Sequence, residues 1–118
     1  MILSRTLRFF IELPPFRRKL DGLPDGQKTL DKLQEALLND PEAGPVMEGT
    51  GGLRKLRVGG EGRGKRGGYR VTYLYLPLAE TIYLFVIYAK NEKDSLTKAE
   101  KKFLKSLVES LRSARKLK

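Results

Sequence analysis

Residues 49–70 read GTGGLRKLRVGGEGRGKRGGYR, and the rest of the chain can be interpreted around this stretch. It contains nine of the chain's twelve glycines and seven cationic side chains, against a single acid, Glu61. The cations are Arg54, Lys55, Arg57, Arg63, Lys65, Arg66 and Arg70. Positive charge on flexible backbone with few side chains is typical of a surface that contacts a polyanion closely. The alternative interpretation is a solvated hairpin tip that keeps the protein soluble.

The segments around the central glycines predict an antiparallel hairpin. Residues 53–58 form the first strand, in which Leu56 and Val58 share one face while Lys55 and Arg57 share the other. A long connection follows at 59–68, and residues 69–76 (YRVTYLYL) form the second strand. Its tyrosines alternate with Arg70, so that arginine lies on the opposite face from them. The pattern thus gathers cations on one surface of a sheet.

The remaining elements predict an α+β domain. We expect a strand at 6–13, helices at 15–20 and 25–38, a turn at 77–80, a strand at 81–89 and a helix at about 97–114. The strand at 81–89 (TIYLFVIYA) is apolar on both faces, which indicates a central, covered strand. Thr97 and Glu100 have the spacing of a capping box at the start of the last helix. That helix has one apolar stripe: Phe103, Leu104, Leu107, Val108 and Leu111.

The element order β-α-α-β-β-β-α favours helices packed on a mainly antiparallel four-stranded sheet, within one domain spanning 1–118. The chain has no cysteine and no histidine, which removes disulfides, the usual zinc ligands and the usual neutral-pH general base. The carboxylates show no paired metal-ligand spacing, so we expect neither a metal nor another cofactor. Without an apolar run long enough to span a bilayer, and without a clean signal peptide, the cytoplasm is the expected compartment.

The net charge of +10 comes entirely from the second part of the chain. Residues 1–47 contain seven cationic and seven acidic residues, whereas residues 48–118 contain seventeen and seven. This asymmetry indicates one side that faces a polyanion, either nucleic acid or an anionic membrane. A membrane-binding protein would need a basic amphipathic helix with exposed aromatic residues, whereas here the basic density lies in a glycine-rich segment. Nucleic acid is therefore the preferred partner.

A basic sheet face without histidine can still cleave RNA, because the substrate's own 2′-hydroxyl can act as the nucleophile. The protein then has to orient that hydroxyl, neutralise charge on the phosphate and help to protonate the leaving 5′-oxygen. Arginine suits the second task, and a lysine crowded by other cations can act as a base. The candidates are Lys55, Arg57, Arg70 and Lys90, with Tyr88 as a stacking or hydroxyl contact. A purely phosphate-gripping or surface role is an equally good interpretation for any one of them.

Three segments together resemble the RelE superfamily of toxins from bacterial type II toxin–antitoxin systems, most closely its HigB-like branch. They are GTGGLRKLRV, GRGKRGGYRVTYLYL and IYLFVIYAKNEKDSLT, in that order. The resemblance implies a RelE-like fold and a ribosome-dependent endoribonuclease that cuts mRNA in the ribosomal A site and halts translation. The catalytic positions that it implies are Lys55, Arg57, Arg70 and Lys90. We expect Arg54, Arg63, Lys65, Arg66 and Tyr88 to contact RNA or the ribosome.

The resemblance also implies a cognate antitoxin, expected to be a helix-turn-helix, HigA-like protein. The chain departs from the family archetype in two places: the archetype has an arginine near Lys90-Asn91, and a tyrosine where this chain has Ser95 or Leu96. The acid that protonates the leaving group is therefore unassigned. Two other functions stay open. One is a catalytically inactive nucleic-acid or protein binding module, and the other is a ParE-like toxin directed at gyrase.

Overall fold

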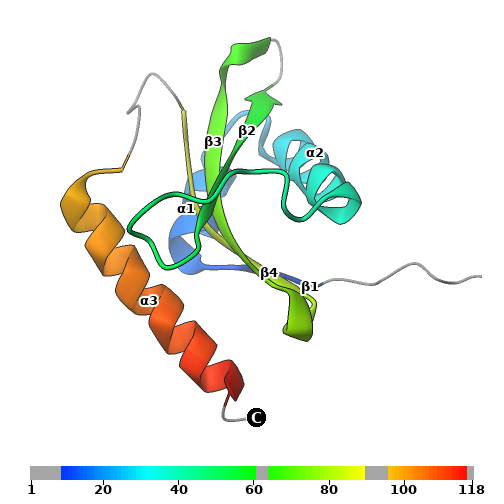
Figure 1. The fold of residues 1–118 in the computed structure, drawn as a ribbon. Coiled ribbons are helices and arrows are strands. Elements are labelled where there is room, and N and C mark those ends of the chain that lie inside the picture. The colour runs from blue at the N-terminus through cyan, green and yellow to red at the C-terminus, as the bar shows by residue number, and fades with distance from the viewer. Residues whose placement is uncertain (1–8, 61–63, 90–95, 117–118) are drawn as a thin grey trace, which may run out of the picture.

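A computed structural model describes residues 9–60, 64–89 and 96–116 of the chain. The elements in chain order are β1 (Phe9–Glu12), α1 (Pro14–Asp21), α2 (Gly26–Asn39), β2 (Arg54–Gly60), β3 (Gly64–Leu76), the 3₁₀ helix η1 (Pro77–Ala79), β4 (Thr81–Ala89) and α3 (Lys98–Lys116). This is the predicted α+β order, with a four-stranded sheet, two N-terminal helices and a C-terminal helix (Figure 1).

The sheet has the strand order β1-β4-β3-β2. β2, β3 and β4 are antiparallel to their neighbours, and β1 runs parallel to β4. The prediction of a mainly antiparallel sheet is therefore confirmed, and so is the central place of β4. Eight of the nine β4 residues are buried, because strands pair with both of its edges and helices lie over both of its faces.

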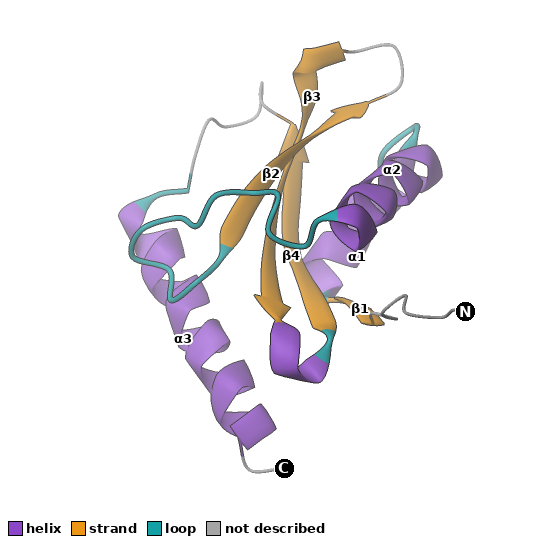
Figure 2. Cartoon of the chain, turned by 45° about the vertical axis from the view of Figure 1, so that its right-hand side comes forward, coloured by secondary structure: helices purple, strands orange, loops and turns teal. Residues whose placement is uncertain are grey.

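The helices α1 and α2 cover one face of the sheet, as predicted, and α3 lies on the other (Figure 2). The core under α1 and α2 contains Phe16, Leu20, Leu30, Leu33 and Leu37 from the helices. From β3 it takes Tyr69, Val71 and Tyr73, and from β2 it takes Val58 with Leu56 packed against it. Burial of this continuous apolar layer fixes which side of each strand faces inward.

α3 packs on the face of the sheet opposite to α1 and α2, and only some residues of its apolar stripe are buried there. Leu104 and Val108 are buried against Leu74, Phe85 and Tyr88, and Leu111 packs at the edge of that cluster. Phe103 and Leu107, predicted to share the stripe, are 65% and 36% exposed, so that part of the prediction is wrong. The helix touches the sheet along a narrower line than its apolar residues span. Its predicted capping box is present, with Thr97 N donating to Glu100 (2.8 Å) and Glu100 N to Thr97 Oγ1 (3.1 Å).

The hairpin between β2 and β3 is longer than predicted. The expected connection at 59–68 is wrong, because β2 continues to Gly60 and β3 begins at Gly64, where the two glycines pair. Glycines are poor strand formers, so residue propensity favoured a loop there. The backbone pairing of the two strands overrides that local preference.

A β-bulge in β4 changes which side chains face α3. Thr72 pairs with Val86 and Tyr73 pairs with Leu84, so Phe85 is an extra residue in β4. Before the bulge, the even-numbered Leu84 packs in the α1–α2 core; after it, the odd-numbered Ile87 does. Tyr88 consequently faces the α3 side, whereas strict alternation from the start of the strand would have placed it in the core under α1 and α2.

Candidate RNA-binding and catalytic site

Two of the predicted cations, Arg57 and Arg70, lie in one row with Tyr88 across three strands on the α3 side of the sheet. Leu56 and Val58 belong to the opposite core, so the alternation of β2 turns Lys55 and Arg57 toward the α3 side. Arg57 pairs with Arg70 of β3, and Arg70 pairs with Tyr88 of β4. The row Arg57–Arg70–Tyr88 is called the basic row below.

Arg70 is a buried cation with an unsatisfied hydrogen-bond donor in the described part of the chain. Its side chain is only 3% exposed, and its Nη1 atom has no hydrogen-bond partner among the described residues. Like charges directly opposite each other on a sheet are destabilising, and Arg57 is the cross-strand partner of Arg70. An unpaired buried guanidinium nitrogen beside a second cation is costly for folding, and an anionic ligand would relieve both costs.

A second row lies next to the basic row and marks the edge of the site. Lys55 pairs with Thr72, and Thr72 pairs with Val86. Thr72 is fully buried, and its hydroxyl has no hydrogen-bond partner among the described residues. Residues further along β3 on this side, Leu74 and Leu76, belong to the apolar cluster under α3. On this side of β3, the end with Arg70 and Thr72 is thus polar, and the end with Leu74 and Leu76 is apolar; the apolar end is called the dry end below.

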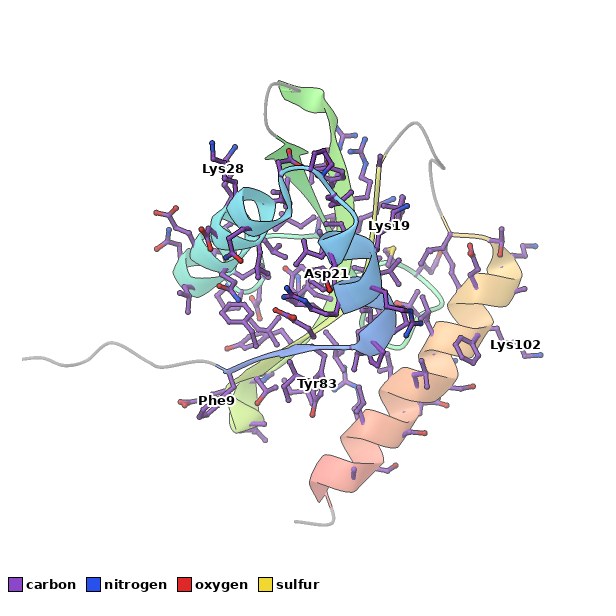
Figure 3. The ribbon with its side chains drawn as sticks, turned by 180° about the vertical axis from the view of Figure 1, so that it is seen from behind. Phe9, Lys19, Asp21, Lys28, Tyr83 and Lys102 are labelled. Atoms are coloured by element: carbon purple, nitrogen blue, oxygen red, sulfur yellow. The ribbon has the colours of Figure 1, made fainter. Side chains whose placement is uncertain are left out.

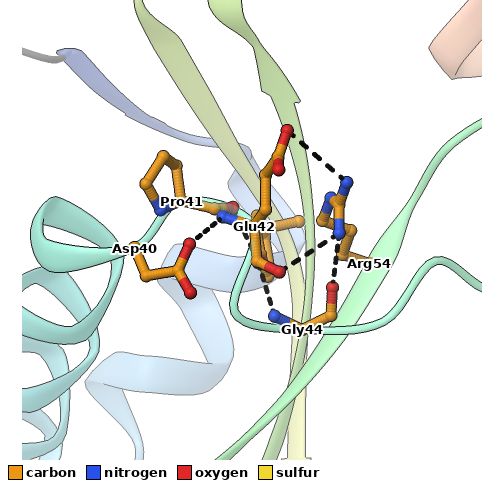
Figure 4. A network of polar contacts seen from close by, with 6 residues as sticks. Asp40, Pro41, Glu42, Gly44 and Arg54 are labelled. Carbon is orange, nitrogen blue, oxygen red and sulfur yellow. Dashed lines mark hydrogen bonds and ion pairs between the residues drawn. The ribbon is translucent and has the colours of Figure 1, made fainter.

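Arg54 does not join the basic row. It pairs with Tyr73 and shares the side of β2 that carries Leu56 and Val58. Its Nη1 donates to the carbonyl oxygens of Gly44 (2.8 Å) and Glu42 (3.3 Å), as Figure 4 shows. These hydrogen bonds anchor the loop that precedes β2, and contact of Arg54 with RNA stays a prediction.

Tyr73 holds the same loop from the buried side. Its hydroxyl donates to the carbonyl oxygen of Pro41 (2.9 Å) and accepts a hydrogen bond from Gly44 N (3.0 Å). Burial is the largest cause that raises the pKa of the Tyr73 hydroxyl above its ordinary value of 10.0, so the hydroxyl stays protonated and able to donate. No side chain fits at Gly44, because a Cβ there would lie 2.5 Å from the carbonyl oxygen of Lys55.

Two early glycines of the basic stretch, Gly51 and Gly52, lie against side chains of α3. Gly49, Gly51 and Gly52 have positive φ angles of 81°, 78° and 120°, which glycine adopts without strain. A Cβ at Gly52 would lie 2.6 Å from a guanidinium nitrogen of Arg112, and Arg112 donates to the carbonyl oxygen of Gly51 (3.2 Å). Thr50 is buried, and its hydroxyl accepts a hydrogen bond from Leu53 N. This segment therefore supports the helix, and the polyanion-contacting surface begins only with β2.

Four predicted site residues have positions or side chains outside the described part of the structure. Arg63 and Lys90 are outside the described residues, and the side chains of Lys65 and Arg66 are not described, although both belong to β3. Leu96 is described and is buried in the apolar cluster with Tyr88. Leu96 and Tyr88 thus pack together, and the Tyr88 side chain is only 4% exposed.

Sequence reasoning missed one residue of this region, Thr72. Its position between Arg70 and Leu74 follows from the alternation, but burial of its hydroxyl without a partner in the described part of the chain depends on the packing of three strands. The described residues contain no group of three acidic, histidine or cysteine side chains that could hold a metal ion. None of the described helices is long and apolar enough to cross a membrane.

Comparison with known proteins identifies the class to which this fold and site belong. Residues 29–118 match the sequence model of a family described as the RelE toxin of the RelE/RelB toxin–antitoxin system. Because that match covers most of the chain, the protein belongs to the RelE toxin family and is a RelE-like toxin of a toxin–antitoxin system. The HigB-like branch stays a prediction.

Solved structures of E. coli RelE share the fold. A double arginine-to-alanine mutant of RelE in the free state is 16% identical, with a TM-score of 0.56, covering 75% of this chain and 90% of that one. The isolated RelE toxin is 15% identical, with a TM-score of 0.55, covering 86% and 99%. The toxin–antitoxin complex RelBE contains a chain 18% identical, with a TM-score of 0.53, covering 69% and 94%. These similarities confirm the predicted RelE-like fold.

Proposed function

We propose that this protein is a metal-independent endoribonuclease that cuts mRNA in the ribosomal A site and so inhibits translation. The observation that supports this most strongly is the basic row with Lys55 beside it, because Arg57, Arg70 and Tyr88 stand on adjacent strands at paired positions. Members of the RelE family are generally endoribonucleases, and a face that combines permanent cations with an aromatic hydroxyl suits that reaction.

In the proposed reaction the 2′-hydroxyl of the message attacks the adjacent phosphorus. The bond from phosphorus to the 5′-oxygen of the next nucleotide breaks, leaving a 2′,3′-cyclic phosphate and a free 5′-hydroxyl. One proton leaves the 2′-hydroxyl and one reaches the 5′-oxygen. Arg57 and Arg70 neutralise the charge that builds on the phosphate oxygens, with forked N–H donors that match two oxygens at once.

The proton transfers fall to the remaining groups of the site. Lys55 and Lys90 are the candidates for the base, since an amine can accept a proton and the chain has no histidine. Tyr88 is the cross-strand partner of Arg70 and the candidate for a stacking or hydroxyl contact, which requires its side chain, 4% exposed in this structure, to become uncovered. Thr72 lies next to the site, paired with Lys55 on one side and with Val86 on the other.

The partners follow from the same proposal. The message and the 30S A site are the targets in the bacterial cytoplasm, and a cognate antitoxin neutralises the toxin. RelE is solved in complex with its antitoxin in the RelBE structure, which supports an antitoxin here as well. A helix-turn-helix, HigA-like antitoxin is the form that the HigB-like resemblance favours.

Primer extension on a translated message tests the activity. Purified protein is incubated with the message with and without ribosomes, next to Arg70→Ala and the control Lys32→Ala on the exposed side of α2. The parent and the control should cut at A-site codons only with ribosomes present, and Arg70→Ala should cut about 100- to 1000-fold more slowly.

Each outcome of this assay is decisive. Cutting without ribosomes would keep the nuclease and remove the ribosome dependence. Cutting by folded Arg70→Ala at the parental rate would show that the site is wrongly assigned. If the folded parent cuts in neither reaction, the protein is better explained as a binding module.

A further inference from the structure

α3 carries four lysines on one flank near its N-terminal end. They are Lys98, Lys101, Lys102 and Lys105, and this set is called the lysine row. With 100° per residue, Lys98 and Lys105 lie nearly one above the other, and the other two lie on either side of that line. Lys98, Lys102 and Lys105 are exposed, and Lys101 is partly buried. Figure 3 shows Lys102 projecting away from the body of the molecule.

The lysine row is unfavourable for the helix that carries it. Lys98 with Lys102 and Lys101 with Lys105 are like-charged pairs four residues apart, a spacing at which equal charges repel. Three of the four lysines lie near the helix N-terminus, where the helix dipole favours anions and disfavours cations. None of the four forms an ion pair with another described residue. Local stability therefore gives no reason for the arrangement, whereas binding of an anionic partner does.

The lysine row lies on the same side of the sheet as the basic row. Leu96, just before α3, and Leu104 within it are buried in one cluster with Tyr88, a member of the basic row. The first turns of α3 therefore approach the end of β4 at which the basic row stands, as Figure 1 shows. On its other side, Lys105 borders the loop that leads into β2, because a Cβ at Gly51 would lie 3.4 Å from Lys105 Cγ.

The exposed apolar residues of α3 occupy a different flank. Phe103 and Lys105 are two residues apart and so lie about 160° from each other around the helix axis. Phe103 and Leu107 consequently cannot enter a lipid surface while the lysine row contacts its headgroups. A membrane-bound helix also needs a broad apolar face to insert, and the exposed large apolar residues of α3 in its described part are Phe103 and Leu107. RNA, whose phosphates can contact a single basic flank, fits the geometry better.

We propose that the lysine row binds an RNA phosphate backbone outside the cutting site. This inference rests on the proposed function, because it assumes that the toxin engages a ribosome carrying a message. The backbone can belong to ribosomal RNA or to the message beyond the cleaved bond. In either case the lysine row supplies affinity that is insensitive to nucleotide sequence, while the basic row performs the chemistry.

The salt dependence of binding tests the proposal. The variant Lys102→Gln/Lys105→Gln keeps Lys98, Lys101 and the capping box, and the control Arg18→Gln/Lys32→Gln removes the same charge from α1 and α2. Binding is measured to vacant 70S ribosomes without message and to a labelled RNA oligonucleotide, over a range of KCl concentrations. Each phosphate contact contributes roughly 0.7–0.9 to the slope of log K against log salt, so the α3 variant should lose about 1.4–1.8 from that slope.

The two probes separate the sources of phosphate. A reduced slope on ribosomes alone assigns the lysine row to ribosomal RNA, and a reduced slope on the oligonucleotide as well assigns it to the message. Parental slopes in the α3 variant, or an equal reduction in the control, would overturn the proposal. So would an effect seen only with phosphatidylglycerol vesicles. A parent that binds ribosomes through these lysines but cuts nothing would retain this inference and refute the proposed activity.

Discussion

The two ends of β3 differ on the side that faces α3. Arg70 and Thr72 at one end are buried without partners for Arg70 Nη1 and for the Thr72 hydroxyl, among the described residues. Leu74 and Leu76 at the other end are buried in an apolar cluster with Leu104 and Val108 of α3. On one face of one strand, Arg70 and Thr72 thus lower the stability of the fold, whereas Leu74 and Leu76 raise it. The difference is one of chemistry and not of burial, because both ends are buried but only the end with Leu74 and Leu76 is apolar.

Burial of the apolar end with Leu74 and Leu76 offsets the free-energy cost of the polar end with Arg70 and Thr72. Burying a leucine contributes roughly 1.5–3 kcal/mol relative to leaving it exposed. Opposed arginines and an unsatisfied donor cost energy of a similar order, about 1–3 kcal/mol for the unsatisfied group. If this division is correct, substitutions at the two ends should separate stability from cutting.

Leu74→Ala should give the largest effect on stability. Leu74 is fully buried under α3, so removing its side chain leaves a cavity and should lower the free energy of unfolding by about 2–5 kcal/mol. Urea denaturation measures this, with Leu78→Ala as the control, because Leu78 is fully exposed in η1. Cutting per folded molecule should remain parental. A loss of cutting in folded Leu74→Ala comparable to that of Arg70→Ala would show that the two ends are not separate.

Thr72→Val tests the boundary between the ends. Valine has nearly the shape of threonine, and the hydroxyl that it removes is buried without a partner among the described residues. The free energy of unfolding should therefore rise by about 1 kcal/mol. Thermal or urea unfolding measures the gain, and the same preparation is tested for cutting. If stability rises and cutting is unchanged, Thr72 belongs to the dry end; if cutting falls tenfold or more, the hydroxyl belongs to the site.

The titration of Tyr73, the next residue, should give the smallest effect, and this effect is visible only at high pH. The pKa of its hydroxyl is raised by burial above 10.0, so the folded state retains the proton after the unfolded chain has lost it. Its contribution to stability is therefore complete below pH 10 and is lost as the pH rises from 10 through the raised pKa.

The measurement is the free energy of unfolding between pH 9 and pH 11, for the parent and for Tyr73→Phe. The parent should lose stability more steeply with pH, by no more than about 1.4 kcal/mol per pH unit of the shift. Phenylalanine also loses the hydrogen bonds to Pro41 and Gly44, which should lower stability at every pH. Parallel pH curves for the two proteins would contradict the assignment of a raised pKa to Tyr73.

Much of the fold could be predicted because its signals are local. The strand at 81–89 was predicted at its observed bounds, and the helices of the first layer were predicted to within a residue or so at each end. Period-two alternation placed Lys55, Arg57 and Arg70 on one face, and the structure pairs Arg57 with Arg70. The longer hairpin was missed because backbone pairing of Gly60 with Gly64 leaves no trace in side-chain pattern.

The site was only partly predictable because some of its geometry depends on neighbouring strands. Alternation along the strand already separates Arg54 from Lys55, but only the structure reveals that Arg54 donates to the carbonyl oxygens of Gly44 and Glu42. Gly51 and Gly52 looked like part of the basic surface, yet they lie against Lys105, Val108 and Arg112 of α3.

By itself the sequence determined the α+β order, the basic side of the sheet, the capping box and the resemblance to RelE toxins, since each depends on residue type and spacing along the chain. The sequence already made Tyr88 a candidate, but only the tertiary structure decided that it pairs with Arg70, because the bulge at Phe85 is a property of two strands in register. Only the tertiary structure, too, decided where α3 stops covering the face. A helix of given apolar pattern can pack along several lines, and the glycine loop beneath it selects one.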